Sequence, residues 1–390
     1  MAPTVGPGVA VAVTRLFALV IIFFVTCQSH AAVLPEQRAD LIYHTYEGDN
    51  TDVDGPAVLV RKNFAEKVSV WGRYYEDVVS GASIDVRAAA TSFIETRTEF
   101  GGGVDYLYGK TKLNAGYTNS DSGDYLSDSF SLGVSHEFFG DLTSVSLTFG
   151  FSDEVVLDVT DDSFEDEVQT ESFALSISQI LTKNSVIGIT AQSIASEGFL
   201  NSPYRVVRFA DAAQIASNTF GIEDELYPRI RNSDAVAIRY NHFLPYRASI
   251  RGEYRWFADS WGIRSNNFRL DYIHPVSQRF TLHFNARYYE QSNADFFSDL
   301  FEFSEATTFR ARDKELSTYS TTSFGVGASY ELPDTYLPFF DKTKVNFFFD
   351  RVSYSYDDFR DVTAEGFQVG EEPLFGFDAV VFRAFVSFWY

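Results

Sequence analysis

The alternation of apolar and polar residues with a period of two constrains this chain more than any other feature. In residues 246–256 the even positions are apolar or aromatic, and the odd positions are polar, with three arginines among them. Successive side chains of a β-strand point to opposite faces, so such a segment has one apolar and one polar face. The same split occurs in residues 144–151, 280–289 and 323–330. The chain is therefore predicted to be all-β.

The connections between these segments alternate between short and long. The short ones fall at 109–110, 139–142, 182–185, 244–245 and 275–277, and the long ones at 80–91, 121–126, 157–168, 197–232, 292–316 and 357–375. Short periplasmic turns and long external loops are typical of outer-membrane barrels. The pattern predicts a transmembrane, antiparallel, up-and-down β-barrel of about 16 strands, within a range of about 14 to 18. Both termini are expected on the periplasmic side.

Composition narrows the class of protein further. Aromatic residues make up 17% of the chain, which suits a barrel that places rings against lipid. The formal net charge of -23 argues against a nucleic-acid partner, because such a partner needs a basic face. After the first 31 residues there is no cysteine, so neither a disulfide framework nor thiol chemistry is expected.

The first 31 residues have the layout of a secretory signal peptide. Arg15 precedes the apolar run 16–25, and small residues follow up to Ala31. We therefore expect cleavage after Ala31, export, and a single barrel domain over residues 32–390. Cys27 suggests a lipoprotein as the alternative, but Thr26 before it is a poor fit to the lipidation motif.

The last segment has the form of a terminal recognition strand. Phe382, Val386, Phe388 and Tyr390 share one face, and the chain ends on the aromatic residue itself. Outer-membrane proteins present such a strand to the barrel-assembly machinery, which is therefore an expected partner. The alternative is an ordinary buried terminal strand. With the signal peptide and the loop pattern, the assembly signal is favoured.

Several segments resemble one family of exported Gram-negative proteins, catalogued as a domain of unknown function. They include "VLPEQRADLIYHTYE" (33–47), "GVDYLYGKTKLNAGYTNS" (103–120) and "YRASIRGEYRWFADSWGIRSNNFRLDYIHP" (246–275). The resemblance implies an outer-membrane barrel over nearly the whole exported chain. It also implies genes nearby for a thioredoxin-like protein, a small lipoprotein and a flavin transferase, so that periplasmic partners are expected. It transfers no catalytic or binding residues.

Charged residues on the polar face form the best candidate site. They are Arg247, Arg251, Glu253, Arg255, Arg269, Asp271, His283 and Arg287. One interpretation is an arginine-lined pore wall that selects anionic solutes. The other is an internal salt-bridge network that braces the barrel, because an unpaired charge in a narrow lumen is costly. The interspersed carboxylates favour the brace.

Other chemistry has weaker support. The sequence contains no common hydrolase, metalloprotease or phosphate-loop motif, so no enzyme, cofactor or metal site is predicted. Acidic residues crowd 153–167 and suit either a solvated loop or contact with the lipopolysaccharide layer through divalent ions. Outer-membrane lipid and lipopolysaccharide are the expected surroundings.

Two functions follow from these observations. The first is a porin-like conduit for small polar or anionic solutes, because about 16 strands can enclose an aqueous lumen. The second is a closed barrel that acts as an envelope scaffold, associated with a redox or flavin-handling system. Loop 197–232 is then the expected plug or partner surface, since long connections tend to be functional.

Overall fold

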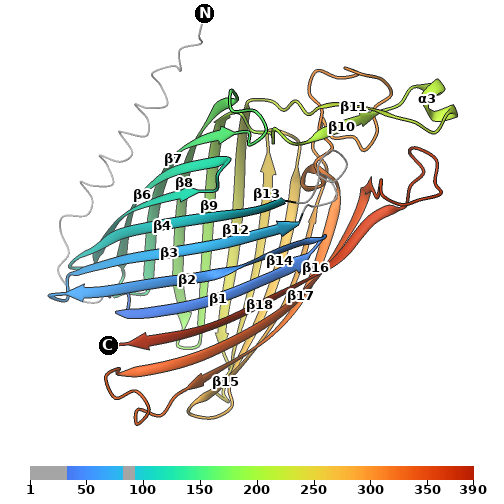
Figure 1. Cartoon of the computed structure of the whole chain (residues 1–390). Coiled ribbons are helices and arrows are strands. Elements are labelled where there is room, and N and C mark those ends of the chain that lie inside the picture. Colours follow the sequence, from blue (N-terminus) through green and yellow to red (C-terminus); the bar gives the residue numbers. More distant parts are fainter. Residues whose placement is uncertain (1–32, 82–92) are drawn as a thin grey trace, which may run out of the picture.

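A computed structural model describes residues 33–81 and 93–390 as a closed antiparallel barrel of 16 strands (Figure 1). Its strands follow chain order around the wall, and β1 pairs with β18 to close it. The predicted up-and-down barrel is therefore confirmed. The predicted signal peptide, residues 1–31, lies outside the described residues.

The strand bounds show long, regular segments. The first nine are β1 (Arg38–Gly48), β2 (Thr51–Phe64), β3 (Val68–Gly81), β4 (Phe93–Tyr108), β5 (Thr111–Asp121), β6 (Tyr125–Phe138), β7 (Thr143–Leu157), β8 (Glu165–Thr182) and β9 (Ser185–Gly198). The others are β12 (Ile230–Phe243), β13 (Ser249–Asp259), β14 (Arg264–Pro275), β15 (Phe280–Gln291), β16 (Tyr319–Glu331), β17 (Lys342–Arg360) and β18 (Leu374–Trp389).

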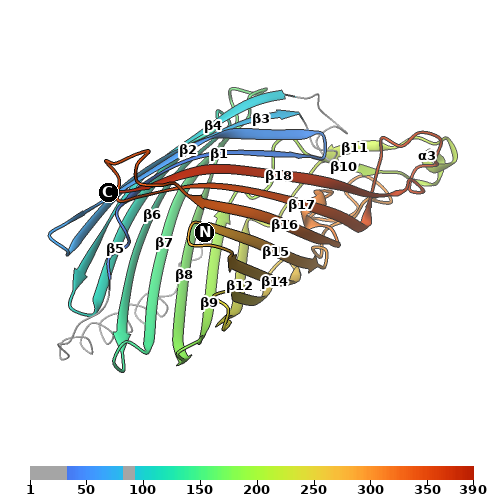
Figure 2. The same cartoon turned by 90° about the horizontal axis from the view of Figure 1, so that it is seen from below.

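Closure leaves no barrel strand with an unpaired edge. β1 and β18 pair without interruption from Arg38↔Trp389 to Glu47↔Val380. Each strand of the wall thus pairs along both edges, which a strand needs in order to cross lipid. Figure 2 shows that the C-terminus lies at the opposite end of the barrel from β10, β11 and α3.

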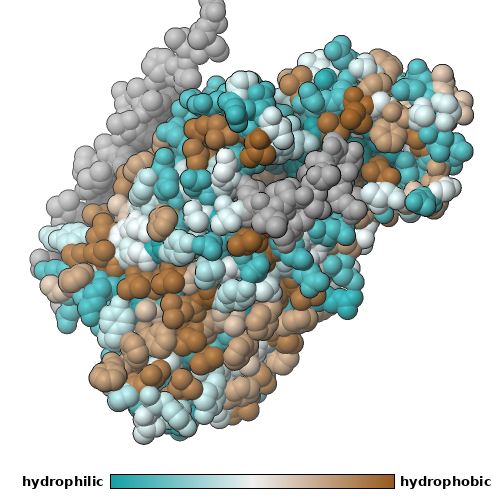
Figure 3. Space-filling model, in the orientation of Figure 1, coloured by the Kyte–Doolittle hydropathy of each residue, from teal (hydrophilic) through white to brown (hydrophobic). Residues whose placement is uncertain are grey.

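The alternation read from the sequence becomes two different surfaces. Large apolar side chains such as Phe100, Leu132, Phe268 and Phe324 are exposed on the outside of the wall. Figure 3 shows hydrophobic side chains gathered over the barrel wall, with hydrophilic ones predominating at the end that carries the long loops. This is the distribution that a membrane-spanning barrel requires.

The loop bounds differ from the prediction because several strands run further. Within the described part of the chain, the long connections between barrel strands span 158–164, 199–229, 292–318 and 361–373, whereas most of the predicted loop 80–91 lies outside the described residues. Strand pairing satisfies backbone groups in water as well as in lipid, so the ladders continue past the apolar band. At the short-turn end, the connection 332–341 between β16 and β17 is longer than the predicted rhythm suggested.

The connection 199–229 has structure of its own. It contains the hairpin of β10 (Val206–Phe209) and β11 (Gly221–Asp224), with α3 (Ala212–Ala216) between them. The hairpin and α3 project beyond the end of the barrel (Figure 1). A short 3-10 helix, η1 (Lys314–Leu316), lies in the connection 292–318. Among the described residues, no helix is long and apolar enough to span a bilayer.

Candidate functional site in the barrel lumen

Strands β13–β15 bring most of the predicted charge cluster together. The register places Glu253, Arg269 and Arg287 side by side, and Arg251 opposite Asp271. Their neighbours along each strand are apolar residues of the exposed outer face, so these charged side chains face the lumen. The strands thus concentrate charge on one part of the inner wall.

Three of the predicted residues form ion pairs. Arg269 holds Asp271 at 2.9 Å on the same strand, and Glu253 pairs with Arg239 of β12 at 2.5 Å. The side chains of Arg239 and Arg269 are still 52% and 50% exposed. Ion pairs between side chains this exposed contribute about 0–1 kcal/mol to the stability of the fold. These two pairs therefore neutralise charge in the lumen more than they stabilise the wall.

Three other arginines have neutral partners. Arg251 donates to the side-chain oxygen of Asn241 at 2.8 Å, and Arg287 to that of Asn267 at 2.5 Å. Arg255 lies 3.5 Å from the side-chain oxygen of Gln192. Within residues 33–81 and 93–390, none of the three forms an ion pair with a carboxylate. Their positive charge is therefore available to a solute.

The remaining predicted residues have other roles. His283 lies 3.0 Å from the Ser329 hydroxyl and beside the ring of Phe348. Arg247 was predicted on the strand, but it lies in the turn before β13, with a positive φ of 69°. The turn from Leu244 to Ala248 is longer than the alternation predicts, so β13 begins only at Ser249.

Sequence reasoning missed several charged residues of the lumen. Arg239 lies between the outward Ile238 and Tyr240, an alternation that was visible in the sequence. Asp350 accepts from Asn285 at 2.9 Å and from Arg383 at 2.6 Å. The residues next to Asp350 in the sequence do not identify it as part of the site, because its partners come from β15 and β18.

The inner face of β6–β9 is different in kind. Phe130, Phe149 and Phe173 point outward, and the alternate positions on the inside are small. Hydroxyls on this wall pair with one another, as Ser176 does with Thr190 at 2.9 Å. The small lumen positions are Ser127, Ser129, Ser131, Gly133, Ser135, Ser144, Ser146, Thr148, Gly150, Ser152, Thr170, Ser172, Ala174, Ser176, Ser178, Gly188 and Thr190. Larger residues on the same face include Glu154, Gln192 and Ile194.

External loops cover the mouth of the barrel beside β12–β18. An apolar cluster there includes Trp261, Phe297, Leu316 and Phe359, and it packs against ends of lumen-facing strands, as at Tyr319. With Tyr227 of connection 199–229, the cluster draws residues from four different connections or strand ends. Burial of apolar surface therefore stabilises the position of these loops, in addition to their backbone hydrogen bonds.

Buried charge ties three of these loops together, in a group that we call the loop latch. Arg208 of β10 pairs with Asp299 and, at 2.6 Å, with Glu372. Arg312 pairs with Asp299 at 2.9 Å and lies over the ring of Phe359. The side chains of Arg208 and Arg312 are each only 3% exposed. The latch joins 199–229, 292–318 and 361–373.

A further ion pair reaches the first strands of the barrel. Lys314 of η1 lies 2.8 Å from Asp49, in the turn between β1 and β2. The connection 292–318 thus contacts the wall two strands beyond β17, around the closure.

The electrostatics of the latch agree with its geometry. Burial raises the pKa of Glu372, but hydrogen bonds and the charge of Arg208 outweigh it, so the pKa lies below its ordinary value. Burial alone would lower the pKa of Arg208, and the two carboxylates raise it instead. In the adjoining apolar cluster, burial raises the pKa of Tyr227 well above its usual range. Glu372 and Arg208 are therefore both charged at neutral pH.

Comparison with family models decides the affiliation. A model described as "Protein of unknown function (DUF3570)" matches residues 85–347, which is more than half of the chain. The chain belongs to the DUF3570 family. This agrees with the resemblance found in the sequence, and the fold of this DUF3570 member is that of outer-membrane β-barrels. No curated protein matches the sequence.

Solved structures with a similar shape are distant in sequence. A bacterial polysaccharide outer membrane secretin has a TM-score of 0.48 at 9% identity, with 92% of this chain and 100% of the secretin covered. A FadL homologue from Pseudomonas aeruginosa has a TM-score of 0.41 at 10% identity, covering 91% and 90%. The siderophore receptor PirA from Pseudomonas aeruginosa has a TM-score of 0.43 at 8% identity, covering 83% of this chain and 57% of the receptor.

The terminal strand of the DUF3570 barrel places its aromatic residues as its sequence suggests. Phe382, Val386 and Phe388 alternate with Arg383 and other inward residues of β18. Tyr390 follows the strand and donates its hydroxyl to the Arg61 carbonyl at 3.0 Å. Recognition of this face by the assembly machinery stays a prediction.

Proposed function

We propose that this DUF3570 barrel is a conduit for small anionic solutes across the outer membrane. The observation that carries the proposal is the set Arg251, Arg255 and Arg287, whose side chains face the lumen and contact amides and aromatic rings but no carboxylate among the described residues. A charged group on a pore wall selects solutes of the opposite sign at short range. No catalytic step is part of this proposal.

Space for the solute comes from the opposite wall. Positions such as Ser131, Thr148 and Ser176 on β6–β8 project little into the lumen. Lumen arginines of the charged wall remain about half exposed, as Arg269 does at 50%. Both features support a hydrated lumen beside β6–β9, bordered by cations on β13–β15.

The test is single-channel recording of the refolded full chain in planar bilayers under a KCl gradient. Wild type is expected to conduct with chloride favoured over potassium. Arg287→Gln should lower that preference, because it removes a cation that no carboxylate balances. Arg351→Gln is the matched control, since Arg351 faces outward and pairs with Asp378. A folded protein without conductance, or equal shifts in both variants, would overturn the proposal.

The second candidate is an envelope scaffold that docks a periplasmic thioredoxin-like protein or lipoprotein. It is favoured by the connection 332–341 at the short-turn end, where Tyr336 and Phe339 are 72% and 90% exposed. Exposed aromatic side chains are frequent anchors of protein interfaces. A photo-crosslinking residue at Phe339 should capture one of these proteins in cells, whereas capture of lipid alone would count against the scaffold.

A further inference from the structure

Aromatic side chains of four neighbouring strands, β15–β18, form a row on the inner wall of the barrel. We call this set the ring row; its members are Tyr289, Tyr319, Tyr354 and Phe377. The ring centroids are 5.7 Å apart for Tyr289 and Tyr319, and 6.5 Å apart for Tyr319 and Tyr354. Tyr354 and Phe377 are stacked at 4.4 Å. Such spacings are those of interacting aromatic pairs, so the row is a continuous aromatic surface.

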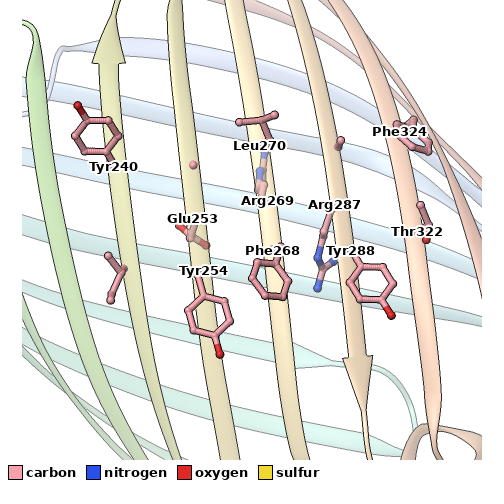
Figure 4. A pocket seen from close by; sticks show the side chains of 13 residues that line it. Tyr240, Glu253, Tyr254, Phe268, Arg269, Leu270, Arg287, Tyr288, Thr322 and Phe324 are labelled. Atoms are coloured by element: carbon pink, nitrogen blue, oxygen red, sulfur yellow. The ribbon is translucent and has the colours of Figure 1, made fainter.

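The ring row faces the lumen. Tyr288, next to Tyr289 on β15, lines a groove on the outer surface of the wall, so Tyr289 points inward (Figure 4). Towards the external end, Tyr319, Tyr354 and Phe377 pack against the apolar cluster beneath the loops, and each of them remains partly exposed. The wall lies behind these rings and the cluster lies on their external side. Their exposed surface is therefore turned to the lumen.

Arg287 stands beside the ring row with unused hydrogen-bond donors. Its guanidinium lies 5.6 Å from the centre of the Tyr289 ring. The Nε atom donates to Asn267, whereas the two terminal nitrogens donate to no residue within 33–81 and 93–390. These two nitrogens can hold both oxygens of one carboxylate, a geometry that suits arginine. A carboxylate bound there has an aromatic surface next to it.

The other end of the row has the opposite charge. Gln291 accepts from the Tyr289 hydroxyl at 2.7 Å and donates to the Glu315 carbonyl at 2.9 Å, which fixes η1 beside the row. The Glu315 side chain is exposed and adds a negative charge on this loop side. A carboxylate solute is attracted by Arg287 and repelled by Glu315. The two charges therefore orient such a solute, with its carboxylate at Arg287 and the rest of the molecule along the rings.

We propose that the ring row and Arg287 form a binding site for small aromatic carboxylates. The ring of the solute lies over Tyr289 and Tyr319, and its carboxylate accepts from the terminal nitrogens of Arg287. That these compounds also cross the barrel rests on the proposed conduit function, whereas the binding site does not. An aromatic ring gains more from this surface than a saturated ring of the same size, because aromatic pairs contribute beyond the area that they bury.

A second group of rings in the lumen serves as an internal control. Phe348 and Phe385 are stacked at 5.8 Å, and Arg383 lies 5.6 Å from the centre of the Phe348 ring. Here the arginine is already paired, because Arg383 contacts Asp350 at 2.6 Å. Rings and a guanidinium are present in both places, but only Arg287 is without a carboxylate partner among the described residues. We therefore expect no carboxylate binding at Phe348.

Calorimetric titration of the refolded full chain in detergent, with empty micelles as the blank, tests the proposal. The probes are benzoate, cyclohexanecarboxylate, which has the charge without the aromatic ring, and benzamide, which has the ring without the charge. Wild type should bind benzoate about fivefold more tightly than cyclohexanecarboxylate, because only benzoate stacks. It should bind benzamide about tenfold more weakly than benzoate, because the charge-assisted hydrogen bonds are lost.

Variants assign these differences to the proposed residues. Tyr319→Leu keeps an apolar side chain and should bind the two carboxylates equally, whereas Tyr319→Phe should keep the preference for benzoate. Arg287→Gln should bind benzoate no better than benzamide. Phe348→Leu should bind as wild type does. All variants must show the wild-type β-sheet signal.

The outcomes separate this site from the conduit. Equal binding of benzoate and cyclohexanecarboxylate by wild type would overturn the site, even in a barrel that conducts anions. A loss in Phe348→Leu as large as that in Tyr319→Leu would overturn the assignment to the ring row. A benzoate preference that depends on Tyr319 and Arg287, in a barrel without conductance, would support the site and remove the conduit.

Discussion

The two sides of the barrel differ both in their lining and in their cover. Strands β6–β9 line the lumen mainly with Ser, Thr and Gly, and the external connections 122–124 and 158–164 on this side are shorter than 199–229, 292–318 and 361–373. Strands β12–β18 line it with arginines, carboxylates and rings, and the loop latch lies over them. One side therefore provides space and the other provides charge and rigidity. A conduit with this division can select its solute without filling its lumen.

The largest effect is expected from removing Arg208 of the latch. Arg208→Met leaves Glu372 without its cation in a buried site and Asp299 with Arg312 alone, which costs about 3–5 kcal/mol of local stability. Limited proteolysis should then cut within 199–229 and 292–318 much faster, while 122–124 and 158–164 stay as in wild type.

The control for this variant is Arg229→Gln. Arg229 also pairs with an aspartate, Asp166, but its side chain is 59% exposed, so its loss should cost about 1 kcal/mol or less. If the protease cut both variants at the same rate, the latch would not hold the loops. The conclusion that the β12–β18 side is the more rigid one would then be wrong.

Acid is expected to loosen the same side without any mutation. The folded pKa of Glu372 lies below its ordinary value of 4.5, so its contribution to stability is complete above that value and is lost as the pH falls through the lowered pKa. Hydrogen exchange in 361–373 should accelerate below about pH 4. In Glu372→Gln the acceleration should already be present at pH 7, and a loop equally protected at both pH values would contradict this assignment.

An intermediate effect is expected on the opposite side. Thr148 lies between Gly133 and Ala174 on the small wall, so Thr148→Trp projects into the open part of the lumen. Conductance should fall to about half or less, because the ring narrows the aqueous path. Thr148→Ser should conduct as wild type does. An unchanged current in Thr148→Trp would place the path elsewhere.

The smallest effect is expected from adding free charge to the arginine wall. Glu253→Gln leaves Arg239 without its carboxylate, so a fourth cation is available to solutes. The anion preference in a KCl gradient should rise by about a factor of two or less, since Arg239 is half exposed and screened by salt. A fall in anion preference would contradict the proposed role of the wall.

Much of the fold could be predicted because the alternation is local. The odd residues Arg251, Glu253 and Arg255 face the lumen for the same reason that Ile250 and Tyr254 face lipid: the strand has a period of two. Arg247 departs from this pattern because the turn at Leu244–Ala248 interrupts the strand. Turn conformation depends on how the neighbouring strands register, which the alternation does not specify.

The candidate site could be predicted only in part. The presence of arginines on the inner face was readable, but not which of them keep a free charge. Arg287 meets Asn267 and not a carboxylate, and Glu253 takes Arg239 from another strand. The loop latch was beyond reach, since Arg208 and Glu372 are far apart in the chain and meet only when three loops fold together.

The sequence by itself determined that this chain forms a membrane barrel with a charged interior, because the two faces of each strand follow from neighbouring residues alone. Tertiary structure decided how the charges are balanced. Gly325 of β16 has no side chain, so Asn285 of β15 reaches Asp350 of β17 directly across it. Such contacts depend on register and closure around the whole barrel, and those are properties of the assembled sheet.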